Sequence, residues 1–380
     1  MSELISYQIC PPTGATTLSC HFGRQGIGLE ETSETLPSDS FFAALVAQAA
    51  QLKGAQFGDD GGPLFAQPFV SGEPPFLVSS LFPRIGDLPL LPRPLLKLNM
   101  KEKLNDQIGK GFKKLRYLSP ELFATVCRGD KISEAPVIMQ GGKVWLSRNE
   151  ARSLTGDWKR DKQAESEVEW HKRLAQSSIW KIESPPHVTV DRVSNTSAYY
   201  EVGQVTYAPH AGLVLLVRFV DATQQAVFER MLTLLSESGL GGRRSSGLGA
   251  FCWERKEPLR LGLGQGGSRA VLLSRYLPQE AELAALRSER AAYQLVRVGG
   301  WVYSLGRPSQ RRQRVMMVSE GAILDTKAAA VRGHVEDVRP VYSEKRPHPQ
   351  VGSGNGTSHP VYRSGLALTL AIPDAKEGNS

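Results

Sequence analysis

The sequence predicts a mixed α+β fold of two ferredoxin-like (RRM-like) domains, the first with a glycine-rich loop and an inserted arm or thumb. The chain has 380 residues, which is long for one domain. Residues 261–267 are rich in glycine, as linkers between domains are. On each side of this linker, strand patterns mix with one or two helical patterns. We therefore expect domains at 1–257 and 258–380, with an insertion in the first at about 97–181.

The first half opens with strand and helix patterns in alternation. Ile5, Tyr7 and Ile9 alternate with polar residues, which predicts a half-buried strand over 4–9. A second strand is predicted over 16–22. Ser38 and Asp39 can cap a helix over 39–53, whose apolar residues share one face. Another strand is predicted over 76–82.

The segment from Lys97 to Lys181 differs in composition from its surroundings. Lysine and arginine are frequent, apolar runs are short, and residues 155–172 are a dense mixture of charges. This composition favours an inserted arm or an extended hairpin over core structure. A partly disordered surface loop is the alternative.

Regular patterns return after the insertion. Strands are predicted at 187–191 and 197–207, and a nearly continuous apolar run at 213–220 predicts a fully buried strand. A helix at about 223–237 then ends at Gly239, and a strand follows at 249–254. In the second half, strands are predicted over 269–276, 293–303, 315–318 and 366–371. One short helix is predicted over 280–289.

Composition limits the function classes. Lysine and arginine total 46 against 38 acidic residues, a net charge of +8 that favours polyanionic partners. The four cysteines form no metal-binding spacing and fit a reducing, cytoplasmic compartment. No apolar segment is typical of a signal peptide or a membrane span. We expect no cofactor, no metal and no membrane partner.

The stretch from Ser238 to Phe251 carries the most functional information. Glycines let the backbone approach a ligand closely, and successive N–H groups can form an anion-binding concavity. Arginine and serine side chains suit phosphate oxygens. The stretch therefore predicts a loop that holds a polyphosphate or a nucleic-acid backbone. A helix C-cap at Gly239 followed by a solvated basic loop is the alternative. The residues proposed for binding are Gly239, Gly241, Gly242, Arg243, Arg244, Ser245, Ser246, Gly247 and Gly249.

Residues outside this stretch extend the predicted site. His21, Phe22 and Arg24 end the first predicted strand pair and could stack on or pin a base. Arg192 lies in a second loop of the same domain. The further predicted contacts are Gly26 and Gly28 in the first domain and the cluster of Arg307, Arg311 and Arg312 in the second. A solvated loop is the alternative for that cluster.

Several short blocks of sequence, distributed along nearly the whole chain, together resemble a known protein family. They are His21–Glu30, Pro37–Leu45, Ser79–Pro83, Leu91–Pro94, Lys113–Leu118, Asp191–Val193, Gly239–Phe251, Leu273–Tyr276, Gly299–Trp301 and Tyr362–Leu366. Together they resemble the RAMP superfamily of CRISPR proteins, and within it subunit four of the type III-A Csm effector complex.

The resemblance implies a non-catalytic subunit that caps one end of an RNA-guided complex in antiviral defence. It implies binding to the 5′ repeat-derived handle of the CRISPR RNA (crRNA) and docking of the large polymerase-like Cas subunit. It also implies contact with the backbone RAMP subunit, and a thumb near the target RNA.

Two enzymatic alternatives remain at this point. A RAMP-superfamily endoribonuclease could process crRNA with His21 as general acid or base. A nucleotide-binding enzyme could instead use the glycine loop. Asp39 beside Ser38 is better explained as a helix cap than as a catalytic aspartate. We expect a protein that is not an enzyme.

Overall fold

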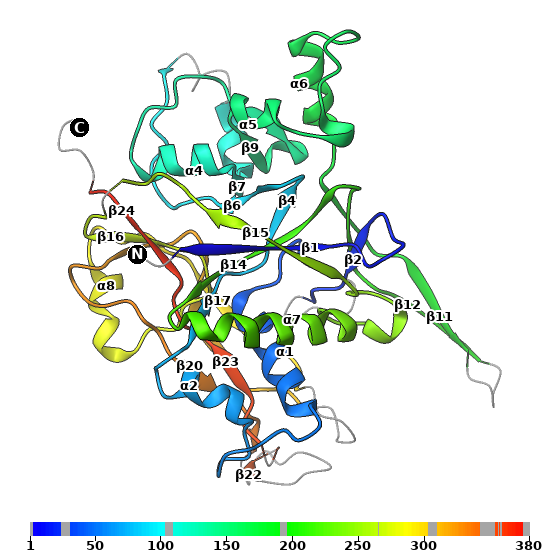
Figure 1. Cartoon of the computed structure of the whole chain (residues 1–380), viewed down its shortest axis with the longest axis vertical. Helices are drawn as coiled ribbons and strands as arrows, with labels where there is room; N and C mark the ends of the chain where they lie inside the picture. Colours follow the sequence, from blue (N-terminus) through cyan, green and yellow to red (C-terminus); the bar gives the residue numbers. More distant parts are fainter. Residues whose placement is uncertain are drawn as a thin grey trace.

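The computed structural model describes residues 3–23, 31–102, 109–190, 196–264, 266–302, 310–342, 354–355, 357 and 359–374. It is a mixed α/β protein with a central antiparallel sheet and two helices along one face of that sheet (Figure 1). In chain order, the elements of this part are β1 (Leu4–Cys10), α1 (Ser38–Gln51), β3 (Phe76–Val78), β4 (Phe82–Ile85), β5 (Leu88–Pro89), β14 (Ala211–Phe219), α7 (Gln225–Ser238) and β15 (Cys252–Leu259). The sheet order is β15-β1-β14-β4-β5, and β3 also pairs with β14.

The apolar patterns of this sheet form the core. Every residue of β14 except Arg218 is buried, which confirms the predicted buried strand. On β1, Tyr7 packs against Phe228 of α7 with ring centroids 5.2 Å apart. The prediction of a half-buried β1 was wrong, because Gln8 on its other face is also buried. The Gln8 amide donates a hydrogen bond to the Asp87 carboxylate at 3.0 Å, which satisfies the polar group inside.

The start of α1 differs from the predicted cap. Pro37 is the N-cap, and neither Ser38 nor Asp39 caps the helix. The Ser38 hydroxyl instead accepts a hydrogen bond from the backbone N–H of Arg275 at 2.8 Å. The buried Asp39 carboxylate lies 3.5 Å from the guanidinium of Arg363, which is only 9% exposed. These polar residues therefore join the first half of the chain to the second.

A second sheet and a projecting pair of strands lie beside the central sheet. β2 (Leu18–Cys20), β10 (Trp180–Glu183) and β13 (Gln204–Tyr207) form a sheet in the order β10-β13-β2. Among the described residues, β11 (Pro186–Val190) and β12 (Ser197–Glu201) pair only with each other, and they extend away from the body (Figure 1). We call this pair the β11–β12 hairpin. Val188, Val190 and Tyr199 on it are 60%, 59% and 64% exposed.

The region predicted as an arm is a packed unit. Its elements are β6 (Leu91–Pro92), β7 (Tyr117–Leu118), α4 (Pro120–Cys127), β8 (Val137–Met139), β9 (Val144–Leu146), α5 (Arg148–Arg152) and α6 (Glu167–Gln176). The strands form a sheet in the order β6-β7-β9-β8, and Trp145 of β9 and Phe123 of α4 are fully buried. The expectation of an extended hairpin within 97–181 was therefore wrong. Short apolar runs from several elements combine with large aromatic side chains to build this core.

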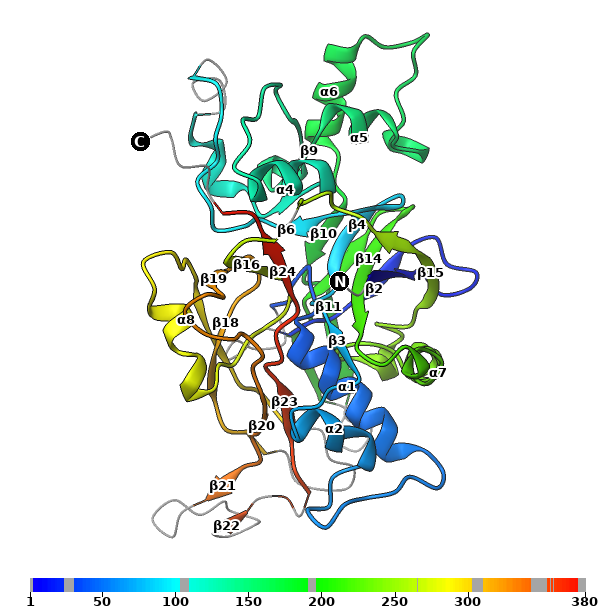
Figure 2. The same cartoon turned by 60° about the vertical axis from the view of Figure 1, so that its left-hand side comes forward.

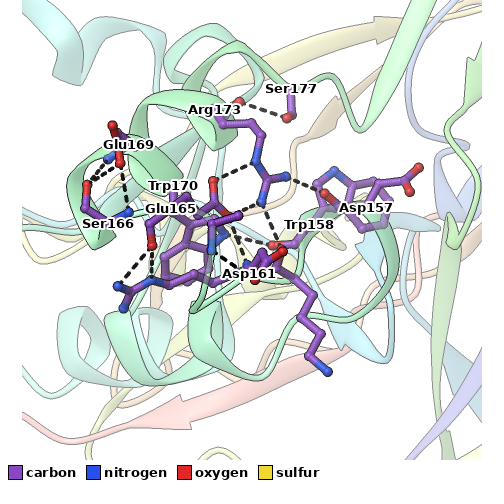
Figure 3. Close-up of polar contacts among 12 residues, drawn as sticks. Asp157, Trp158, Asp161, Glu165, Ser166, Glu169, Trp170, Arg173 and Ser177 are labelled. Carbon is purple, nitrogen blue, oxygen red and sulfur yellow. Dashed lines mark hydrogen bonds and ion pairs between the residues drawn. The ribbon is translucent and has the colours of Figure 1, made fainter.

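The charge-dense stretch of this unit is ordered around tryptophan (Figure 3). Trp158 and Trp170 are buried, and the Trp170 indole N–H donates to the Trp158 carbonyl at 2.9 Å. The Arg173 guanidinium pairs with the Glu165 carboxylate at 2.6 Å. Ser166 and Glu169 form a capping box at the start of α6. The charges therefore surround and cover a small apolar centre.

The second half is built from small sheets that pack against the first (Figure 2). β16 (Arg269–Leu272), β19 (Ile323–Asp325) and β24 (Thr369–Ile372) form a sheet in the order β19-β16-β24. The other elements are α8 (Ala284–Arg287) and the pairs β17 (Leu295–Val298) with β18 (Val315–Val318), β20 (Val335–Asp337) with β23 (Tyr362–Ser364), and β21 (Val341–Tyr342) with β22 (Gly354–Asn355). The short α2 (Gln67–Val70) belongs to the first half. Val271, Leu368 and Ile372 share one apolar core with β14 and α1.

Candidate nucleic-acid interface

The glycine loop, residues 239–250, lies against the end of β2. Gly239 ends α7 with a φ of 81°, which confirms the predicted helix end. The Gly242 N–H donates to the His21 carbonyl at 2.9 Å, and the Gly249 N–H donates to the Ser19 carbonyl at 2.8 Å. These bonds connect one arm of the loop to β2 and the other arm to the residue that directly follows β2.

Close packing explains the glycines in these arms. A Cβ atom at Gly249 would overlap the carbonyl oxygen of Leu240, and one at Gly241 would overlap that of His21. Both residues also have positive φ, at 81° and 83°. Their first role is therefore to let two backbone segments touch.

The backbone N–H groups of the loop are mostly used inside the protein. Those that donate to protein carbonyls belong to Gly239, Leu240, Gly242, Ser246, Gly247, Leu248 and Gly249. A donor already paired in this way is not available to a phosphate. The structure therefore shifts the ligand-binding potential of the loop from its backbone to its side chains.

The tip of the loop is a single exposed turn of 3-10 helix, Arg244–Ser246. Ser245, Ser246 and Gly247 are exposed, and both arginines of the tip are half-buried. Arg243 precedes the turn in a left-handed conformation with a φ of 57°, which is uncommon for a residue with a side chain. The turn thus presents two cations and two hydroxyl groups on one short segment.

Arg243 connects the loop to the β11–β12 hairpin. Its guanidinium lies over the ring of Tyr200 at 5.2 Å from the ring centroid. The Tyr200 ring in turn stacks on His187, with centroids 5.4 Å apart and planes 21° from parallel. We call these three residues the Arg243 stack. It joins the tip of the loop to both strands of the hairpin.

His21 and Phe22 lie beneath the loop. They are 6% and 3% exposed, so neither ring is presented to solvent. The His21 Nδ1 lies 2.6 Å from the Gly203 carbonyl, and the Phe22 N–H donates to the Thr32 hydroxyl at 2.8 Å. Both residues are thus positioned to support the loop.

Two buried tyrosines, Tyr207 of β13 and Tyr117 of β7, contact the same residue, Glu34. Burial raises the pKa of Tyr207 and of Tyr117 well above the usual range. The Tyr207 hydroxyl donates to the Glu34 carbonyl at 2.7 Å, and the Tyr117 hydroxyl donates to the Glu34 carboxylate at 3.2 Å. These groups act as neutral hydrogen-bond donors in the core.

The basic cluster of the second half also contains an arginine–aromatic pair. The Arg311 guanidinium lies 4.9 Å from the ring centroid of Trp301, which is 59% exposed. The Arg312 guanidinium donates a hydrogen bond to the Gly299 carbonyl, which fixes its position.

Five other predicted contacts lie outside the described residues: Arg24, Gly26, Gly28, Arg192 and Arg307.

Sequence reasoning missed three aromatic residues that the structure brings to these cations: His187, Tyr200 and Trp301. The sequence contained part of the information needed to find them. His187 and Tyr200 lie in strands that were predicted, but only the pairing of those strands places the two rings together. For Trp301, the signal was its position directly after Gly299 and Gly300, close to the arginine cluster.

The described part of the chain was also considered for metal sites and membrane-spanning helices, and it has neither. It contains no group of three or more histidine, cysteine or acidic side chains that could hold a metal ion. None of its helices is long and apolar enough to cross a membrane.

Known proteins resemble the chain over almost its full length. The CRISPR Csm4 C-terminal domain family matches residues 265–372. The "CRISPR system Cms protein Csm4" of Mycobacterium tuberculosis (strain CDC 1551 / Oshkosh) is 24% identical over 365 residues, covering 93% of this chain and 95% of that protein. The protein of the same name from Methanocaldococcus jannaschii is 21% identical, and the match covers 92% of this chain and 93% of that protein.

Solved structures share the fold. A chain of the "Crystal structure of Csm3-Csm4 subcomplex in the type III-A CRISPR-Cas interference complex" matches with a TM-score of 0.56 and 15% identity, over 97% of this chain and 99% of that one. A chain of the "Crystal structure of Csm1-Csm4 cassette in complex with cA4" matches with a TM-score of 0.55 and 16% identity, over 99% and 100%. The sequence matches therefore make this chain similar to proteins named Csm4 over more than nine-tenths of its length.

Proposed function

We propose that this chain is a structural RNA-binding subunit of a type III-A CRISPR effector complex. It binds the 5′ handle of the crRNA, caps the complex, and docks a large Csm1-type subunit and a Csm3-type backbone subunit. The observation that carries the proposal is the similarity to proteins named Csm4 over more than nine-tenths of both chains. The related crystal structures hold Csm4 with Csm1 or with Csm3.

The geometry of the glycine loop supports an RNA ligand. Arg243, Arg244, Ser245 and Ser246 extend from one turn, and single-stranded RNA requires cations and polar groups along its backbone. The inner glycines, together with His21 and Phe22, hold that turn in place. In the second half, Arg311 over the exposed Trp301 offers a cation beside a stacking surface. The same arrangement gives no comparable support to a nucleotide-binding enzyme.

The strand order supports a ferredoxin-like first domain. Its elements follow one another as β1, α1, β3–β4, β14, α7 and β15, and the sheet order is β15-β1-β14-β4. A β-α-β-β-α-β chain of this kind is the ferredoxin-like unit. We propose domains at 1–257 and 258–380. The second domain would be a modified version, since its described strands belong to several small sheets.

The β11–β12 hairpin is our candidate for the thumb near the target RNA. It extends from the body and carries exposed apolar side chains at Val188, Val190 and Tyr199. Such side chains can pack against bases that are unstacked from a duplex. Because the Arg243 stack lies at this hairpin, handle binding and thumb position would be connected.

We further propose that the chain is cytoplasmic and does not catalyse a reaction. The comparisons favour the structural subunit over the crRNA-processing endoribonuclease. The surroundings of His21 agree, because a buried ring bonded to the Gly203 carbonyl is poorly placed to reach a ribose hydroxyl.

Co-expression with candidate Csm1, Csm3 and a crRNA gene tests the proposal. We expect one particle containing all three proteins and a crRNA with a constant 5′ end. The same preparation, incubated with labelled repeat RNA, should leave that RNA intact. Specific cleavage that disappears in His21→Ala would contradict the structural role, as would a particle that assembles fully without this chain.

A further inference from the structure

The four cysteines fall into two pairs with different surroundings. Cys20 and Cys127 are each 1% exposed, and burial raises the pKa of each thiol to about 12. Cys10 and Cys252 are half-buried, so a small reagent can reach them. Only the second pair has the exposure that thiol chemistry requires.

Cys10 and Cys252 are cross-strand neighbours. They are directly opposite each other in the antiparallel register of β1 and β15. Residues so placed have side chains on the same face of the sheet and Cα atoms about 4.5–5.5 Å apart. A disulfide spans Cα separations of about 4.4–6.8 Å. The two sulfurs can therefore be joined without moving either strand far.

A buried arginine lies beside one of these sulfurs. Arg84 is 6% exposed, and its Nη2 donates a hydrogen bond to the Cys10 sulfur at 3.0 Å. It reaches across β14 at Gly212, its register partner, where an added Cβ would lie 3.2 Å from Nη2. A guanidinium in this position stabilises the negative charge on a sulfur that attacks an electrophile. The Cys252 sulfur instead lies 3.5 Å from the Thr13 hydroxyl.

We propose that Cys10 is a site of oxidation by hydroperoxides and that Cys252 is its resolving thiol. The Cys10 sulfur attacks one oxygen of hydrogen peroxide, the O–O bond breaks, and Cys10 becomes a sulfenic acid while the released hydroxide takes the thiol proton to form water. The Cys252 sulfur then attacks the Cys10 sulfur, an S–S bond forms, the S–O bond breaks, and a second water leaves with the Cys252 proton. Two thiols are oxidised to one disulfide, and one peroxide is reduced to two waters.

The position of this disulfide would affect the loop. Cys252 is the first residue of β15 and follows Gly249, the last packed glycine of the loop, by three positions. Edge strands open more easily than central ones, and β15 is an edge strand of the central sheet. The cross-link would hold the exit of the glycine loop on β1.

Peroxide treatment of the full chain tests the proposal. We expect a disulfide between the peptides of Cys10 and Cys252, found by mass spectrometry without reduction and reversed by dithiothreitol. Cys10→Ser and Cys252→Ser should each abolish it, and Cys20→Ser should not. Arg84→Met should slow disulfide formation by roughly tenfold, with Arg84→Lys intermediate.

Two outcomes would overturn the proposal. One is Cys10 oxidised to sulfinic acid while Cys252 remains a free thiol, since no resolving step then occurs. The other is a disulfide that joins two chains. Circular dichroism of each variant before treatment establishes that it is folded, and the serine variants retain the volume of the thiol closely enough to serve if Arg84→Met does not fold.

Discussion

The two parts of the glycine loop adjoin in sequence and differ in structure. The inner arms, residues 239–242 and 248–250, are bonded to β2 and to each other. The outer turn, residues 243–247, is exposed or half-buried and carries the cations. Glycine in the arms is required by backbone contact, whereas Gly247 in the turn has no atom within 4 Å of an added Cβ. A glycine-rich stretch can thus combine a packing role with a binding role, and substitutions can separate them.

The largest expected effect comes from the inner arms. Gly249→Val places a branched side chain against the Leu240 carbonyl at a φ of 81°. We expect a loss of more than about 3 kcal/mol in the free energy of unfolding, or an insoluble protein. Chemical denaturation measures this. A variant as stable as the wild type would mean that the arms do not touch as described.

Gly247→Ala should have a much smaller effect. The φ of 83° at this position costs a residue with a side chain about 1 kcal/mol, and there is no steric overlap to add to it. The same denaturation experiment compares the two variants directly. Equal losses for Gly247→Ala and Gly249→Val would remove the distinction between turn and arms.

Tyr200→Ala tests how the turn is joined to the hairpin. The cation–π contact with Arg243 is worth about 0.5–1 kcal/mol at an exposed site. We expect faster backbone hydrogen exchange in β11 and β12 with little change in overall stability. Tyr199→Ala is the matched control, because Tyr199 is the exposed neighbour on the same strand. Equal exchange in both variants would mean that the Arg243 stack does not hold the hairpin.

Local patterns predicted most of the regular elements in the first half. The buried strand β14, the helix α7 and its glycine end all lie where their apolar runs and turn residues indicated. Contacts between residues that are far apart in the sequence could not be predicted in this way. The polar residues Ser38 and Asp39 were assigned to a cap, because their partners Arg275 and Arg363 are over 200 residues away. The packed unit within 97–181 was missed because its buried apolar residues come in short runs that are separated by charged residues.

The candidate site was predictable only in part, for the same reason. Its cations and glycines are contiguous in the sequence, and they were identified there. The aromatic partners His187 and Tyr200 come from another segment, and the pairing of β11 with β12 brings them together. Which backbone N–H groups of the loop remain for a ligand also depends on contacts with β2.

The salt dependence of handle binding tests the central claim most directly. The double variant Arg243→Ala/Arg244→Ala and the control Arg230→Ala/Arg260→Ala lose the same charge, and the control removes exposed arginines away from the loop. If the turn contacts RNA phosphates, the slope of log affinity against log salt should flatten by about 0.7 per lost contact in the first variant only. Identical slopes for the two variants and the wild type would contradict the claim that the outer turn holds the RNA backbone.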